Sequence, residues 1–293
     1  IVKYFSEFIE FYQVSDLEAK RLEMFFSCDR IRKDSHPTCQ GILEFYDSIN
    51  FHKSYSHSLT LEPDDFDKAL QILSEIKFDP NTPFVLLHVR EGDGGKNRGA
   101  GNFSISDTYD SIRYLVDCGL QVIRMGDSSM TKLDLECFTS KEVLLIHDYA
   151  HFTKKNSITD FFLFANCKFM IGCDSGPICA PQLFGKPVLR INANHALMTE
   201  KYPGYVVPTR FRDLEGNLVS LDEQYAKNFG WSQATSPSST YTRCYVSSEE
   251  ILRSVKDMMN LPTNDLSNSS LLPHQERFLS LSQKYVLFPG MTL

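Results

Sequence analysis

The sequence lacks several features that would place it in a particular class. It has no apolar run of the roughly 20 residues that a membrane-crossing helix needs, and no basic segment followed by an apolar one stands at its start. Runs of like charge are also missing, since 37 acidic and 30 basic residues are spread over 293 residues with a net charge of −7. We therefore expect a soluble, cytoplasmic protein with no transmembrane segment and no nucleic-acid partner.

Cysteine pairs with recognisable spacing are absent too. The eight cysteines are scattered, with no Cys-x-x-Cys pair and no spacing typical of zinc ligands. We expect most of them to be reduced, half-buried small hydrophobic residues, and we expect neither a resident metal nor a cofactor. The chain opens at Ile1 and not at a methionine, which is consistent with a processed or excised piece of a longer protein.

Composition and patterning divide the chain into three parts. Hydrophobic residues make up 42% of the sequence, enough to bury a sizeable core. Residues 1–80 combine aromatic and charged residues at helical spacing, so we expect a helical N-terminal region there. We expect residues 81–262 to form one α/β domain, and residues 263–293 to form a polar linker and a C-terminal helix.

The central part alternates between apolar strands and helical patterns. The expected strands are Phe84–Val89, Gln121–Met125, Val143–Ile146, Phe169–Ile171 and Val188–Ile191, and the expected helices between them are Asp107–Cys118, Ser157–Cys167 and Pro177–Phe184. Continuous apolar strands separated by helices predict a doubly wound, Rossmann-like parallel sheet covered on both faces. In such sheets, ligands bind beyond the carboxyl ends of the strands, near the point where the strand order reverses.

Further helices are expected on either side of this pattern. Pro63 suits the first turn of a helix that runs to Ile76, with acidic residues near its positive end. Ser247 and Glu250 form a capping box that predicts another helix. Between these regions, Lys201–Tyr205 is interpreted as a turn.

The first candidate ligand loop follows the strand at Phe84–Val89 and has the pattern His88-x-Arg90-x-x-Asp93, followed by glycines. A guanidinium at a strand end can bind a phosphate through two hydrogen bonds, and glycines let backbone N–H groups approach the same anion. His88 is expected to orient a neighbouring group, since no second metal ligand stands at a suitable spacing. The alternative interpretation is a surface ion pair between Arg90 and Asp93 or Glu91.

The second candidate loop is Asp174-Ser175-Gly176-Pro177, which follows a strand and precedes an apolar helical segment. A helix that starts with such residues leaves free N–H groups that suit a phosphate. The alternative is that Asp174 or Ser175 acts only as a helix N-cap.

Two further loops are expected on the same rim of the sheet. Gly126 and Asp127 end one strand, and Asp148 and Tyr149 follow the next. A carboxylate can accept from ribose hydroxyls or base N–H groups, and Tyr149 can stack on a base. Each of these residues could instead serve only the turn in which it stands.

These motifs carry a resemblance to known enzymes. His-Val-Arg-Glu-Gly-Asp (88–93) resembles the first motif of fucosyltransferase-like GT-B glycosyltransferases, in which the arginine is taken to hold the β-phosphate of the donor. The segment from Thr159 to Val188 is similar to the donor-site segment of those enzymes and of heptosyltransferases. From Phe84 to about Glu223, the chain looks like a family of bacterial glycosyltransferases found with surface-polysaccharide genes.

The resemblance implies a GT-B donor-binding lobe in residues 81–262, with a nucleotide sugar as the donor. We expect transfer of a sugar from a nucleoside-diphosphate sugar, with a GDP-sugar slightly favoured, to a hydroxyl of a glycan or another acceptor. Arg90, Ser175 and Gly176 would stabilise the leaving diphosphate without a metal. Asp65-Phe66-Asp67 matches the Asp-x-Asp metal signature of another glycosyltransferase class, but we interpret it as helix-start acids.

The catalytic base and the acceptor site are less defined. Asp93 is the candidate base for the acceptor hydroxyl, with Glu91 second. Residues 1–80 are too short for a complete second sheet domain, so the acceptor lobe is expected to be missing, reduced or supplied by another chain. Two alternatives stay open, namely a non-catalytic subunit that binds nucleotide sugars and a sugar-nucleotide epimerase.

Overall fold

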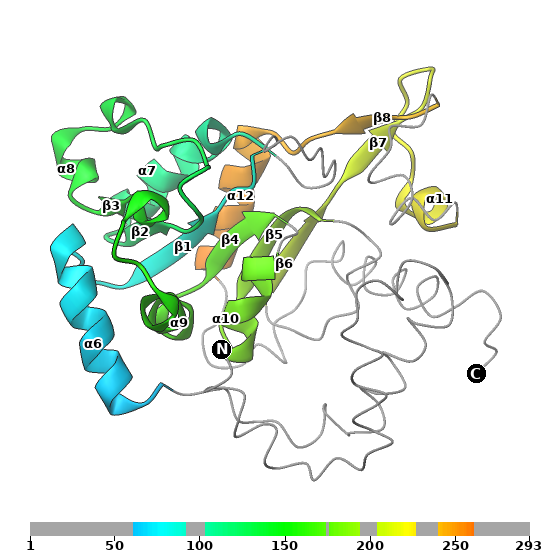
Figure 1. The fold of residues 1–293 in the computed structure, drawn as a ribbon. Helices are drawn as coiled ribbons and strands as arrows, with labels where there is room; N and C mark the ends of the chain where they lie inside the picture. Colours follow the sequence, from blue (N-terminus) through cyan, green and yellow to red (C-terminus); the bar gives the residue numbers. More distant parts are fainter. Residues whose placement is uncertain (1–60, 92–102, 174–175, 194–203, 227–239, 261–293) are drawn as a thin grey trace, which may run out of the picture. The chain divides into compact units, whose positions relative to one another are not determined.

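The computed structural model describes residues 61–91, 103–173, 176–193, 204–226 and 240–260 (Figure 1). Three predicted site residues (Asp93, Asp174 and Ser175) lie outside these ranges, as do most of the N-terminal region 1–80 and the whole of 263–293. Within the described ranges, no helix is both long and apolar enough to cross a membrane.

A parallel sheet forms the centre of the described part. Its six strands are β1 (Phe84–His88), β2 (Gln121–Arg124), β3 (Ile146–His147), β4 (Met170–Cys173), β5 (Val188–Ala193) and β6 (Gly204–Pro208). They lie in the order β3-β2-β1-β4-β5-β6, and each adjacent pair is parallel. The predicted doubly wound α/β fold is therefore confirmed.

Helices cover both faces of this sheet (Figure 1). They are α6 (Pro63–Leu73), α7 (Tyr109–Asp117), α9 (Ser157–Asn166), α10 (Ala180–Leu183) and α12 (Ser248–Met259). Helices α7 and α12 pack together on one face, and α6 and α10 pack against α9 on the other. Such two-sided cover explains why every residue of β1, β2, β4 and β5 is buried.

Side chains that alternate along β1 supply the two halves of the core. Val85 and Leu87 belong to an aliphatic cluster with Leu115 of α7 and Val255 of α12. On the opposite face the packing is aromatic, with rings in edge-to-face pairs at Phe78–Phe84, Phe78–Phe162 and Phe66–Phe162. Edge-to-face contact is the favoured arrangement of aromatic rings.

Within the described ranges, the expected helices are present, with one change of type. Helix α6 continues as the 3₁₀ turn η1 (Ser74–Ile76), and α12 starts with the predicted capping box of Ser247 and Glu250. Helix α7 is preceded by the 3₁₀ turn η2 (Ile105–Thr108). The segment after β4 is not a continuous α-helix, since the 3₁₀ turn η5 (Gly176–Cys179) comes before α10.

The third strand lies later than expected. The predicted strand Val143–Ile146 is confirmed only at Ile146, because Val143 ends α8 (Ser140–Val143), Leu144 and Leu145 form a turn, and β3 starts after them. A capping box formed by Thr139 and Glu142 starts this helix, and Leu144 after it is 66% exposed. The apolar residues of this segment are therefore divided between α8, the turn after it and β3.

The structure also contains strands that the sequence did not predict. Gly204 and Tyr205, which were interpreted as the end of a turn, are instead the first residues of β6, which pairs with β5. Beyond it, β7 (Arg210–Arg212) and β8 (Thr242–Cys244) form a separate antiparallel pair, and α11 (Leu221–Ala226) lies between them in the chain. Asn192 of β5 accepts a hydrogen bond from Val246 N at 3.0 Å, which ties β5 to the start of α12.

Candidate functional site

The strand order reverses between β1 and β4. The chain leaves β1 toward β2 on one side and leaves β4 toward β5 on the other, so the two connections diverge. Divergence at the carboxyl ends of adjacent parallel strands opens a crevice, and this is the usual ligand site of doubly wound sheets. Both predicted ligand loops leave from here, because β1 ends at His88 and β4 ends at Cys173.

Gly172 allows the turn after β4 to pack close to the sheet. A Cβ atom at this position would lie 2.7 Å from Ile178 Cδ1 and 2.9 Å from the carbonyl oxygen of His88. Since real Cβ atoms do not come so near, only glycine fits between β1 and the turn that carries Ile178. The second loop therefore starts directly against the end of β1.

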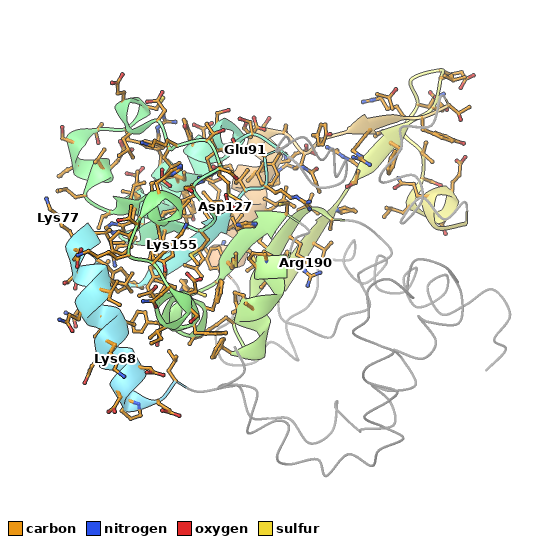
Figure 2. The ribbon with its side chains drawn as sticks, viewed as in Figure 1. Lys68, Lys77, Glu91, Asp127, Lys155 and Arg190 are labelled. Carbon is orange, nitrogen blue, oxygen red and sulfur yellow. The ribbon has the colours of Figure 1, made fainter. Side chains whose placement is uncertain are left out.

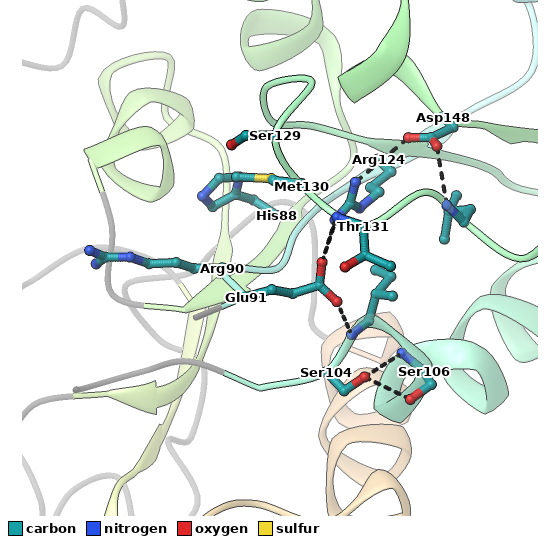
Figure 3. Close-up of polar contacts among 12 residues, drawn as sticks. His88, Arg90, Glu91, Ser104, Ser106, Arg124, Ser129, Met130, Thr131 and Asp148 are labelled. Atoms are coloured by element: carbon teal, nitrogen blue, oxygen red, sulfur yellow. Dashed lines mark hydrogen bonds and ion pairs between the residues drawn. The ribbon is translucent and has the colours of Figure 1, made fainter. Parts of the chain in front are cut away.

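Arg90 extends from a backbone that is held on both sides. Its N–H donates to Sγ of Cys173 at 3.3 Å, and its carbonyl accepts from Phe103 N at 3.3 Å. Figure 3 shows its side chain pointing away from the ion pairs of the neighbouring residues. These two hydrogen bonds fix the backbone from which the Arg90 guanidinium can reach an anion.

Glu91, the next residue, turns its carboxylate toward the protein (Figure 3). One oxygen accepts from Ile105 N at 3.1 Å, and the other accepts from Thr131 N at 2.9 Å and from Nη2 of Arg124 at 3.4 Å. These donors come from three separate segments. Glu91 therefore joins the end of β1 to the loops before α7 and after β2.

Arg124, the last residue of β2, is fully buried, with 0% of its surface exposed. Its second ion pair is with Oδ1 of Asp148 at 3.7 Å. The other oxygen of Asp148 accepts from Leu133 N at 3.2 Å and contacts Nδ1 of His151 at 2.9 Å. We call Glu91, Arg124 and Asp148 the rim triad.

This arrangement bears on the prediction that Asp148 contacts the donor. Both of its carboxylate oxygens face protein groups, so the structure gives Asp148 a role in holding the rim loops. Donor contact through Asp148 stays a prediction without support from these distances.

His88 lies at the end of β1 with only 3% of its surface exposed, and its Nδ1 has no hydrogen-bond partner among the described residues. Burial lowers the pKa of His88 to about 4, a backbone hydrogen bond with Met125 opposes this shift, and the charges of Arg124 and Arg90 add to it. The imidazole is therefore neutral near pH 7.

Gly126 and Asp127 form the start of the loop after β2. Gly126 has a φ of +145°, and a Cβ there would lie 2.2 Å from Sδ of Met130, so the turn requires glycine. Asp127 is exposed, and its pKa is lowered by hydrogen bonds from Ser129 and by the charge of Lys155. Asp127 and Lys155 lie side by side in Figure 2.

Lys155 connects this loop to the next one along the rim. Its Nζ donates to the carbonyl of Gly126 at 2.6 Å and to the carbonyl of Ala150. The loops after β2 and β3 are thus held together by one ammonium group.

Tyr149 is buried, with 1% of its surface exposed. Its hydroxyl contacts Oγ1 of Thr159 at 2.5 Å and donates to Oδ1 of Asp160 at 2.7 Å. Burial raises the pKa of the Tyr149 hydroxyl and that of the Asp160 carboxyl. The ring is part of the core, so its position does not support the predicted stacking on a nucleotide base.

Of the second loop, only Gly176 onward is described, and Gly176 is the first residue of η5. The roles predicted for Asp93, Asp174 and Ser175 lie outside the described residues. Within the part of the chain that the structure describes, no three His, Cys, Asp or Glu side chains are grouped as metal ligands.

Sequence reasoning missed Arg124 and Lys155. A signal for Arg124 was present, since a charged residue stands at the end of a strand that is otherwise apolar. No comparable signal marks Lys155, because its contacts depend on carbonyl groups of two loops. Glu91 was noticed, but as a candidate base.

No protein-family model and no curated protein matches the chain. Among solved structures, it is similar to Escherichia coli ADP-heptose LPS heptosyltransferase II, with 13% identity and a TM-score of 0.44 over 69% of this chain and 53% of that one. It is also similar to a glycosyl transferase family 9 protein from Veillonella parvula, with 10% identity and a TM-score of 0.45 over 75% of this chain and 59% of that one.

A third similar structure is Anabaena HepE in complex with UDP and glucose, with 14% identity and a TM-score of 0.36 over 78% of this chain and 50% of that one. The chain spans between 50% and 59% of the length of these three proteins.

Proposed function

We propose that the chain is the donor-binding part of a glycosyltransferase that moves a sugar from a nucleoside-diphosphate sugar, with a GDP-sugar favoured, to a hydroxyl of a glycan or another acceptor. The observation that carries this proposal is the placement of Arg90 at the carboxyl end of β1, beside the switch point, with its backbone held by Cys173 and Phe103. A guanidinium can hold a diphosphate through paired hydrogen bonds. In the transfer reaction that diphosphate leaves, and a fixed cation stabilises the charge it gains.

Other rim residues complete the proposed donor site. The exposed carboxylate of Asp127 can accept from sugar or ribose hydroxyls, and the neutral ring of His88 can exchange a hydrogen bond with the ligand. Gly176, together with Ser175 and Asp174, would contact the diphosphate from the side of β4. Asp93 remains the proposed base.

The proposal extends to the organisation of the whole chain. Residues 81–262 would form the nucleotide-sugar-binding domain, with residues 1–80 and 263–293 as flanking regions. The acceptor lobe would be missing or supplied by another chain, and the reaction would take place in the cytoplasm.

Calorimetry with GDP-, UDP-, ADP- and CMP-sugars tests the proposal. We expect at least one of them to bind the wild type, and Arg90→Ala to bind it about tenfold or more weakly, since a charge-assisted bidentate contact is lost. Arg253→Ala on α12 is the matched control, because Arg253 is exposed and should leave binding unchanged. Binding of none of the four, or equal binding by Arg90→Ala, would show the proposal to be wrong.

Removal of metal ions tests the proposed stabilisation of the leaving group. If Arg90 fulfils this role without a metal, nucleotide-sugar binding and sugar transfer should persist after exhaustive treatment with a chelator. Loss of transfer that added Mg²⁺ or Mn²⁺ restores would contradict this part of the proposal.

The carboxylates of Glu91 and Asp148 are both engaged in contacts within the protein. This favours one alternative, a subunit that binds nucleotide sugars without turnover. Glu91 and Asp148 both hold Arg124 and backbone N–H groups, so neither is open to deprotonate an acceptor. The alternative predicts nucleotide binding without release of free diphosphate across a screen of acceptors. Release of diphosphate with any acceptor would exclude it.

A further inference from the structure

We propose that Glu91 is a positioning residue and not the proton acceptor of the reaction. Together with the buried Arg124, it holds the backbone from which Arg90 reaches its ligand. This inference rests on the proposed function, because Arg90 matters in this way only if the crevice binds a nucleotide diphosphate. It separates two roles that the sequence alone leaves open for Glu91.

The first argument concerns the oxygens of Glu91. Each of them already accepts a backbone hydrogen bond, from Ile105 N at 3.1 Å or from Thr131 N at 2.9 Å. A base takes up a proton, and a neutral carboxyl is a weaker acceptor than a carboxylate. Proton uptake by Glu91 would therefore weaken the hydrogen bonds from Ile105 N and Thr131 N and remove the charge that faces Arg124.

The second argument concerns the charge beneath Glu91. Arg124 is fully buried, and its Nε and Nη1 form no hydrogen bond with any described residue. Its charge is balanced by Glu91 at 3.4 Å and by Asp148 at 3.7 Å. A buried guanidinium is strongly unfavourable without its counterions. The carboxylate of Glu91 is therefore needed in its charged form and in its present place.

The third argument connects this anchor to Arg90. Across two consecutive residues, the backbone N–H of Arg90 is bonded to Cys173 of β4, its carbonyl to Phe103, and the side chain of Glu91 to Thr131 in the loop after β2. If these contacts were removed, the side chain of Glu91 would no longer be fixed, and Glu91 directly follows Arg90 in the chain. Because a shift of about 1 Å in a positioned group can cost a factor of about 100 in rate, the anchor controls how well Arg90 meets its ligand.

The test compares wild type with Glu91→Gln, and Glu136→Gln is the control because Glu136 is an exposed glutamate in the turn η3 (Leu135–Cys137). In Glu91→Gln, we expect GDP to bind about tenfold more weakly in calorimetry without any acceptor present. We also expect faster hydrogen exchange at the backbone amides of Arg90, Ile105 and Thr131. The control should match the wild type in both measurements.

The two roles predict different results. A positioning role lowers affinity for the nucleotide itself, whereas a base role leaves GDP affinity unchanged and lowers only turnover. Unchanged GDP binding together with unchanged exchange in Glu91→Gln would overturn the inference. If the wild type binds no nucleotide, the proposed function fails, and the exchange data alone then decide whether Glu91 anchors the loop.

A second variant covers the case in which Glu91→Gln does not fold. Arg124→Met combined with Glu91→Gln and Asp148→Asn removes the buried charge together with both counterions, which is tolerated better than removing one member. We expect this triple variant to fold and still to bind GDP weakly, because the anchor is absent. Wild-type affinity in the folded triple variant would contradict the inference.

Discussion

The two ends of β2 carry buried polar side chains of opposite character. At the amino end, Gln121 donates to the carbonyls of Asp79 and Thr82 at 2.7 and 3.0 Å, and its oxygen accepts from Asp79 N and contacts His147 Nε2, both at 3.0 Å. At the carboxyl end, Arg124 has two carboxylates at 3.4 and 3.7 Å, while its Nε and Nη1 lack hydrogen bonds within the described residues.

The difference shows what each end is built to do. The neutral amide of Gln121 has a partner for every hydrogen-bonding group, so it stabilises the fold without any further partner. A buried cation with loosely paired counterions adds little stability, and in some proteins such groups are kept because they fix a particular arrangement. We infer that the amino end of β2 serves folding, while the carboxyl end serves the placement of the rim loops.

The largest expected effect comes from removing both counterions of the rim triad. Glu91→Gln combined with Asp148→Asn leaves the Arg124 charge buried without an anion, and we expect a loss of about 4 kcal/mol in the free energy of unfolding. Urea denaturation with an unchanged m-value measures this loss. Adding Arg124→Met should recover most of it, and a loss below about 1 kcal/mol in the double variant would refute the contrast between the two ends.

The next effect depends on pH and involves His88. Its pKa is about 4 in the folded protein and near 6.5 when unfolded, so between these values the unfolded chain binds a proton that the folded protein does not. Stability is therefore complete above pH 6.5 and should fall by on the order of 3 kcal/mol as the pH drops to about 4.

Comparison of His88→Phe with wild type from pH 7 to 4.5 measures this contribution, since the variant should show a flatter pH dependence of unfolding. Burial also lowers the pKa of His147, which contacts Gln121, so part of the slope should remain. An unchanged slope in His88→Phe would contradict the burial of a neutral imidazole at the rim.

The smallest effect is expected at the amino end. Gln121→Met keeps the size of the side chain but removes its four hydrogen bonds, which should cost about 2 kcal/mol because water can reach some of the freed groups. Nucleotide binding should stay within about twofold of wild type, since the rim loops keep their contacts. Chemical denaturation and calorimetry on the same samples check both statements, and a marked loss of binding would mean that the two ends are not independent.

Local patterns predicted most of the fold. The strand at β1 and the helices α9 and α12 followed from apolar runs and capping residues that act within a few positions. The misplaced third strand shows the limit of this approach, because Val143–Ile146 has a strand-like composition while the capping box at Thr139 and Glu142 starts a helix across its first residue. The capping box was thus visible in the sequence, and it determines that Val143 is helical.

Pairing between distant segments set the rest. Strand β6 contains a glycine and a proline and exists because β5 supplies its partners, and β7 pairs with a strand that comes after α11. In the site, the position of Arg90 beside the sheet was predictable because it follows a strand, whereas the structural role of Glu91 was not predictable. Only the folded chain shows that Arg124 lies buried beneath that carboxylate.

The position of β1 in the sheet also has a consequence for how the protein is made. Leu87 of β1 pairs with Arg124 of β2 on one side and with Ile171 of β4 on the other. As the chain emerges from the ribosome, β2 and β3 can join β1 well before β4 exists, so one edge of β1 stays open during synthesis. An open strand edge invites pairing with other chains until its proper neighbour arrives. The seam between β1 and β4 is therefore the last seam of β1 to close, and a nascent chain that stalls before β4 would leave this edge open to aggregation.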